Sequence, residues 1–164
     1  MFMLVSCTNV YKQVSPSIKL KTEEALNKVS LDRKKVLIEA ITELPVDQQE
    51  GMAYLIAYMR PSDLDTLPAE LLISNVKMAY KARESFVWAK ELPLSVFYNE
   101  VLPYAIMDEK RENWRPALFE MVYPLVKDAK NIYQAVDTIN KSLRGLVKVE
   151  YNTKRDKPNQ APFE

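Results

Sequence analysis

The chain has 164 residues, of which 48% are hydrophobic and 27% are charged, a composition typical of a folded globular protein and not of a disordered one. Its 23 Lys and Arg residues nearly balance the 22 Asp and Glu residues, and the resulting net charge of +1 predicts no nucleic-acid partner. The sequence holds no histidine, one cysteine and two glycines, which excludes histidine-dependent catalysis, common zinc sites and glycine-rich phosphate loops within these residues and predicts a non-catalytic domain without cofactor or metal.

The N-terminal residues 1–17 predict a tether, because residues 8–17 are mostly polar and include a proline. Before them, Leu4-Val5-Ser6-Cys7 resembles the pattern that lipoprotein signal peptidases recognise, and Cys7 would be the lipidated residue. The apolar part of such a signal would have to lie upstream of Met1. Two interpretations stay open: a lipid-anchored protein of the bacterial cell envelope, or a cytoplasmic protein in which Cys7 occurs by chance.

Residues 18–146 predict an all-α domain, a multi-helix bundle of about seven helices separated by prolines. The expected helices lie at 23–29, 30–44, 47–59, 69–91, 95–102, 114–127 and 131–145. The expected caps of the first two helices are Thr22 and Ser30, and the spacing of Asp47 and Glu50 predicts a capping box for the third.

Arg83 falls on the apolar stripe of the longest expected helix, at 69–91. A charged head group at such a position must pair with an acidic group or reach water along the surface of a neighbour. Two roles therefore stay open for Arg83: a structural one, with its stem packed on the core, and a contact with an anion or a partner.

The last two expected helices differ in regularity. Pro124 is expected to bend or break the helix at 114–127, because it removes a backbone donor. The final helix has an unbroken apolar face, with Asn131 and Gln134 as a cap pair and Gly145 at its end. Its face consists of Ile132, Ala135, Val136, Ile139, Leu143 and Leu146.

The hydrophobic period changes after this helix. Val147, Val149 and Tyr151 alternate with polar residues, which predicts a strand-like segment. A single strand finds no partner in an otherwise helical chain. We interpret residues 147–164 as a strand and a linker toward a further domain, and a genuine C-terminus with a frayed strand is the alternative.

Two pairs of side chains have spacings that suggest chemistry. Asp63 and Asp65 supply too few oxygen ligands for Mg²⁺ or Ca²⁺, so a capped helical turn is the preferred interpretation. Tyr54 and Tyr58 stand four residues apart on one helix face, and the edge of the core is the preferred interpretation there.

Residues 101–116 combine aromatic and charged side chains within a few turns. Tyr104 and Trp114 are expected to act as anchors with one apolar and one polar end. Arg115 is expected to pair with Glu109 or Glu112. These residue types predict a structural role for the segment.

The same segment carries a family resemblance. Phe97, Val101-Leu102-Pro103-Tyr104, Glu109, Trp114-Arg115 and Ile139-Asn140 stand in an order that resembles the helical region before the catalytic domain of bacterial transglutaminase-like proteins. The resemblance covers residues 90–155, and Ala105 stands where the family usually has arginine. It implies a papain-like core after residue 164, with a catalytic Cys, His and Asp, that acts on amides or thioesters.

Two hypotheses follow. The resemblance implies that this chain is a non-catalytic helical domain that packs on its own downstream catalytic domain and shapes access to it, with Tyr104, Trp114 and Arg115 as structural or interdomain positions. The alternative is a free-standing helical module that binds a protein or peptide. Both predict no catalytic residue here, and both allow contact with a membrane only through a lipid on Cys7.

Overall fold

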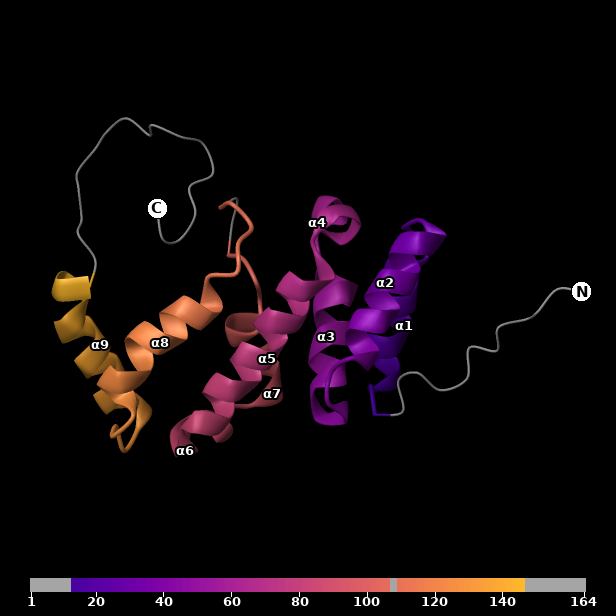
Figure 1. Ribbon diagram of the computed structural model, residues 1–164. Helices are drawn as coiled ribbons and strands as arrows, with labels where there is room; N and C mark the ends of the chain where they lie inside the picture. Colours follow the sequence, from indigo (N-terminus) through magenta and orange to yellow (C-terminus); the bar gives the residue numbers. More distant parts are fainter. Residues whose placement is uncertain (1–12, 107–108, 147–164) are drawn as a thin grey trace, which may run out of the picture. The chain divides into compact units, whose positions relative to one another are not determined.

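The computed structural model describes residues 13–106 and 109–146, which form nine α-helices and one short π-helical turn and contain no strand (Figure 1). The prediction of an all-α fold is therefore confirmed. The described chain has two α-helices more than the expected seven, the short helices α4 (Pro61–Thr66) and α6 (Val87–Lys90), while α7 (Leu94–Val96) lies where a longer helix was expected. Cys7 and the strand-like segment at 147–151 lie outside the described residues.

The chain divides into two compact units, one ending at Val76 and the other beginning at Lys77, so that the boundary falls within helix α5 (Ala69–Ser85). In unit 1, α1 (Pro16–Leu26) and α2 (Leu31–Thr42) both pack against α3 (Val46–Tyr58). Fully buried apolar side chains form the core of this unit: Leu26, Leu37, Ile41, Met52, Ile56 and Leu72.

The predicted start of the first helix is wrong. Helix α1 begins at Pro16, in the segment expected to be a tether, because proline suits the first helical turn, where its missing N–H is not needed. Thr22 therefore lies inside α1 and caps nothing. Its buried hydroxyl is 2.8 Å from the carbonyl oxygen of Ile18 and 2.9 Å from that of Ala53 on α3.

The caps of the next two helices differ in outcome. The prediction for Ser30 is confirmed, because its Oγ accepts a hydrogen bond from the backbone N–H of Arg33 at 3.2 Å. The predicted capping box of Asp47 and Glu50 is wrong. Helix α3 begins after Pro45, and Glu50 instead accepts a hydrogen bond from the backbone N–H of Ser15 at 3.2 Å.

Arg33 holds the end of the short helix α4 in unit 1. Its Nε donates to the carbonyl oxygen of Leu64 at 2.7 Å, and its Nη2 donates to that of Leu67 at 2.6 Å. Burial lowers the pKa of Arg33, and the neighbouring Asp65 opposes that shift. The predicted helical turn at Asp63 and Asp65 is confirmed, since both belong to α4, but the predicted cap is not found, because no side chain caps the start of this helix among the described residues.

Unit 2 contains the second half of α5, then α6, α7, the π-helical turn η1 (Phe97–Val101), α8 (Arg115–Val126) and α9 (Ile132–Leu146). Phe97 is fully buried and meets the ring of Tyr80 edge-on, with ring centroids 5.0 Å apart. Helix α8 packs against α9. The helix expected at 95–102 is thus replaced by α7 and η1 in succession.

The helix expected at 69–91 is also interrupted. Helix α5 ends at Ser85, and Phe86 has an extended backbone with φ −131° and ψ 132° before α6 begins. The ring of Phe86 stacks on that of Trp88 at 4.8 Å and lies 5.8 Å from that of Tyr123. The break thus coincides with ring contacts to the nearby Trp88 and to Tyr123 on a later helix, and helical periodicity does not reveal the second of these.

Helix α8 continues through Pro124 to Val126, so the proline does not break it. Pro124 lies in the last turn, where it removes only its own hydrogen bond. The hydrogen-bond ladder continues beyond the proline, since the backbone N–H of Lys127 donates to the carbonyl oxygen of Tyr123 at 2.9 Å.

Candidate functional site

Arg83 lies near the end of α5 and holds the chain that follows α6. Its Nη2 is 3.0 Å from the carbonyl oxygen of Lys90 and 2.7 Å from that of Leu92, and its guanidinium lies over the ring of Phe97 at 4.9 Å. These contacts favour the structural role. Its Nη1 is buried without a hydrogen-bond partner among the described residues, so the contact with an anion or a partner stays open for Arg83.

Tyr104, Trp114 and Arg115 come together at the start of α8. Trp114 donates its indole N–H to the carbonyl oxygen of Tyr104 at 2.9 Å, and the Arg115 guanidinium lies 4.6 Å from the centre of the Trp114 ring. The Nη2 of Arg115 is 2.8 Å from the carbonyl oxygens of both Val101 and Pro103. Hydrogen bonds from Trp114 and Arg115 therefore hold the start of α8 against the end of η1 and the residues that follow it.

The environment of Arg115 explains its placement. A helix end leaves carbonyl oxygens without intrahelical donors, and an arginine is well suited to supply them. Burial lowers the pKa of Arg115 to about 10. Glu109, one of the two expected partners, accepts a hydrogen bond from the backbone N–H of Ile106 at 2.6 Å, and the Oε1 of Glu112 is buried without a hydrogen-bond partner among the described residues.

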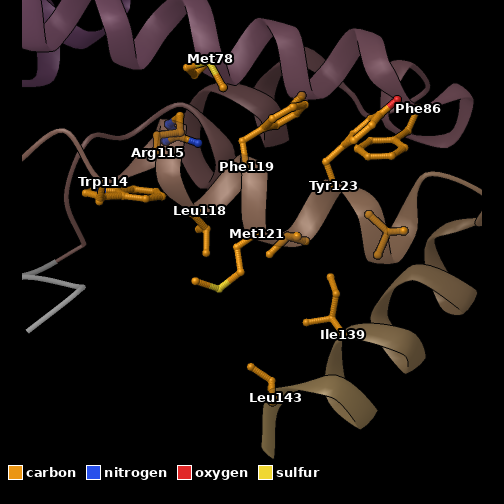
Figure 2. Close-up of a pocket in the computed structure, with 13 residues that line it drawn as sticks. Met78, Phe86, Trp114, Arg115, Leu118, Phe119, Met121, Tyr123, Ile139 and Leu143 are labelled. Carbon is orange, nitrogen blue, oxygen red and sulfur yellow. The ribbon is translucent and has the colours of Figure 1, made fainter. Parts of the chain in front are cut away.

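A cavity of about 380 Å³ lies in unit 2 beside this cluster (Figure 2). Its walls come from α5, α8, α9 and the residues just before α6 and α8. The lining side chains are Met78, Ala82, Phe86, Trp114, Arg115, Leu118, Phe119, Met121, Val122, Tyr123, Val126, Ile139 and Leu143. All of them except Arg115 are apolar or aromatic, and the volume falls within the range of about 300–1,000 Å³ that is common for ligand sites.

Two faces of α8 contribute to the cavity. Phe119 and Tyr123 are on the α5 side, with their rings stacked at 5.2 Å. Leu118 and Met121 point instead toward Ile139 and Leu143 of α9 (Figure 2). One apolar face of α8, with Leu118 and Met121, thus lies opposite the apolar face of α9. We call the space between these two faces the α8–α9 groove.

Both walls of the α8–α9 groove are partly open to solvent. Leu118 and Met121 of α8 are 39% and 37% exposed, and Val136 and Leu143 of α9 are 49% and 42% exposed. Among the side chains of this face that the structure describes, only Ala135 is fully buried. The face that the sequence predicted for this helix therefore exists, but unit 2 covers only part of it.

The groove itself was not predicted from sequence. The signal lies in α8, where Leu118, Phe119, Met121, Val122 and Tyr123 place apolar groups on nearly every side of the helix. A helix with such a pattern must contact apolar neighbours on two sides. In unit 2 it contacts α5 residues on one side and only partly meets α9 on the other.

Other kinds of site receive no support from the described residues. In that part of the chain, no cluster of three or more histidine, cysteine, aspartate or glutamate side chains could hold a metal ion. None of the described helices is both long and apolar enough to cross a membrane. Comparison with protein-family models, with curated proteins and with solved structures found no match to this chain. The resemblance to transglutaminase-like proteins therefore stays a prediction.

Proposed function

We propose that unit 2 is a non-catalytic binding module whose α8–α9 groove holds an apolar segment of a protein partner. The observation that carries this proposal is the apolar cavity of about 380 Å³ whose α8 and α9 walls remain partly exposed. A hydrophobic groove between helices is a common site for an amphipathic helix, which inserts side chains spaced three, four and seven residues apart. The flexible side chain of Met121, which lies in this groove, can adapt to such an occupant.

The test is a selection from a phage-displayed library of random peptides against the full chain. We expect enriched peptides to carry apolar residues at helical spacing. Their binding should fall at least tenfold in Met121→Glu and Leu143→Glu, because each places a carboxylate in an apolar groove. Both positions are partly exposed, so both variants should fold, which circular dichroism can check.

Gln134→Glu is the matched control for this selection. It adds the same charge to α9 on the side away from the groove, and a glutamate oxygen can replace the amide Oε1 of Gln134, which accepts from the backbone N–H of Lys130 at 2.9 Å. Peptides that bind all variants equally well, or a selection without enriched binders, would contradict the proposal.

A second candidate function is the accessory role implied by the resemblance to transglutaminase-like proteins. In this role the helical region packs on a downstream catalytic domain of the same protein and shapes one wall of its substrate cleft. The support is that Trp114 contacts both Tyr104 and Arg115, and the resemblance depends on all three residues. The apolar groove would then be covered by that domain.

Sequencing the native locus separates the two candidates. An open reading frame that continues into Cys, His and Asp at papain-like spacing favours the accessory role, and a stop codon after Glu164 favours the free-standing module. Both candidates predict that purified residues 1–164 show no amidase or acyl-transfer activity. Turnover well above that of a heat-denatured sample would contradict both.

Localisation at the bacterial cell envelope is a separate proposal that depends on Cys7. Signal peptidase cleavage before Cys7 would leave a lipid-modified cysteine as the first residue of the mature protein. Mass spectrometry of the natively expressed protein tests this directly. An unmodified Met1 at the N-terminus would rule out the anchor and favour a cytoplasmic location.

A further inference from the structure

We infer that the partner held in the α8–α9 groove is a second copy of this chain, so that two α8–α9 hairpins pack face to face. This inference rests on the proposed function, because it names the occupant of the same groove. Each copy would present the apolar face of α9 to the groove of the other, which is the self-complementary geometry of a twofold dimer. Two such hairpins would together form a four-helix arrangement with a shared apolar core.

The first argument is that each copy offers both the groove and the element that fits it. The apolar face of α9 includes Ile132, Val136, Ile139 and Leu143, whose spacing of three or four residues is that of a helix bound in a groove. The exposed fractions of Ile132, Val136 and Leu143 are all at least 40%. A second copy therefore needs no further element to supply the occupant.

The second argument is the placement of charge. At about 100° per residue, the side chains that flank the α9 face, Asn140 and Ser142, are polar but uncharged. The ion pair of Asp137 with Lys141, 2.6 Å long, lies on the far side of the helix. On α8, Glu120 likewise falls on the side away from α9, as does Lys127 directly after the helix.

This distribution favours a copy of the chain over a charged partner. Identical faces meet without repulsion only when they carry little charge, since like charges brought together at an interface are costly. Arg115 is the charged side chain of the described lining, and its Nη2 is directed at the carbonyl oxygens of Val101 and Pro103. The net charge of the whole chain, +1, adds almost no repulsion between copies.

The size of the face sets the expected strength. The 12 residues of α8 and 15 residues of α9 correspond to helices about 18 Å and 22 Å long and about 10 Å wide. A face of two such helices buries less than the roughly 1,200 Å² of a stable standard interface, which places the dimer in the weak class. We therefore expect dissociation in the micromolar range.

The experiment is sedimentation equilibrium of the full chain over about 1–300 µM, a range that brackets a micromolar dissociation constant. The wild type should shift from monomer to dimer with concentration. Val136→Glu and Leu143→Glu should weaken dimerisation at least tenfold, and Gln134→Glu, which adds the same charge to the far side of α9, should dimerise like the wild type. Circular dichroism verifies that each variant is folded.

The outcomes separate this inference from the function on which it rests. Dimers that dissociate in the two groove variants and persist in Gln134→Glu support a second copy as the occupant. A chain that stays monomeric at the highest concentration, or a dimer that all variants preserve, overturns the inference. If the monomeric chain still selects peptides that Leu143→Glu abolishes, the binding module stands with another partner, and if it selects none, both proposals fail.

Discussion

The indole N–H of Trp114 donates to the carbonyl oxygen of Tyr104 at 2.9 Å, across the segment that leads from η1 into α8. This bond holds Trp114 against the guanidinium of Arg115, 4.6 Å from the ring centre. Trp114 also lines the cavity of unit 2. Trp114 therefore has two roles: it bonds to the segment between η1 and α8, and it forms part of the cavity wall.

Trp114→Phe should lower the free energy of unfolding by about 1–2 kcal/mol, because it removes the donor and leaves the carbonyl oxygen of Tyr104 without it. Urea denaturation followed by circular dichroism measures the change. Tyr133→Phe on α9 is the control, since Tyr133 is 83% exposed and its loss of a hydroxyl should change little. Equal effects of the two substitutions would mean that the Trp114 bond does not contribute.

Arg83→Met should destabilise the protein by about 1–3 kcal/mol, because the carbonyl oxygens of Lys90 and Leu92 lose a charged donor while the aliphatic packing remains. Arg83→Lys keeps the charge but loses the planar geometry of the guanidinium. Its free energy of unfolding should therefore lie between those of Arg83→Met and the wild type. Urea denaturation gives both values. A stable Arg83→Met variant with impaired peptide binding would instead assign Arg83 to partner contact.

The sequence predicted those features of the fold that depend only on residues close together in the chain. Ser30 caps α2 as expected, because the bond to the backbone of Arg33 spans three residues. The amphipathic face of α9 was also visible, since it depends only on helical spacing. Pro16 shows the limit of such signals, because a proline suits both a loop and the first turn of a helix.

Contacts between residues distant in sequence account for the remaining differences. The long helix is interrupted at Phe86, whose ring lies 5.8 Å from that of Tyr123 on α8, and a single-sequence pattern does not encode that contact. The partners of Arg115 are backbone carbonyl oxygens, which every residue possesses and no motif marks. Tyr104, Trp114 and Arg115 were identified from sequence, whereas the groove required knowing which faces of α8 and α9 meet.

The raised pKa of Tyr54 leads us to expect a loss of stability in alkaline solution. Burial raises its pKa, the neighbouring Tyr58 adds to the shift, and Lys21 opposes it. A tyrosine with a higher pKa in the folded state than in the unfolded state binds more protons when folded, so stability falls as pH rises above about 10. Tyr54→Phe should therefore lose less stability than the wild type between about pH 8 and pH 11.

Urea denaturation at the two pH values tests this expectation, with Tyr133→Phe as the control for an exposed tyrosine. The difference should be small, because the Tyr54 ring is only half-buried. A Tyr54→Phe variant with the same pH dependence as both the wild type and the control would exclude a contribution from this group.

Substitutions of Thr22 test whether this residue caps a helix or lies buried inside one. At a helix N-cap, aspartate replaces threonine without loss. Inside α1, where Thr22 is 1% exposed and its hydroxyl lies 2.9 Å from the carbonyl oxygen of Ala53, a carboxylate would be buried against carbonyl oxygens. Thr22→Asp should therefore cost at least about 3 kcal/mol of unfolding free energy.

Thr22→Val is the comparison variant. It keeps the shape of the side chain, removes the hydroxyl from carbonyl oxygens at helical positions, and should cost less than about 1 kcal/mol of unfolding free energy. Urea denaturation ranks the two variants, and an aspartate variant as stable as the wild type would place the start of the helix at Thr22 after all.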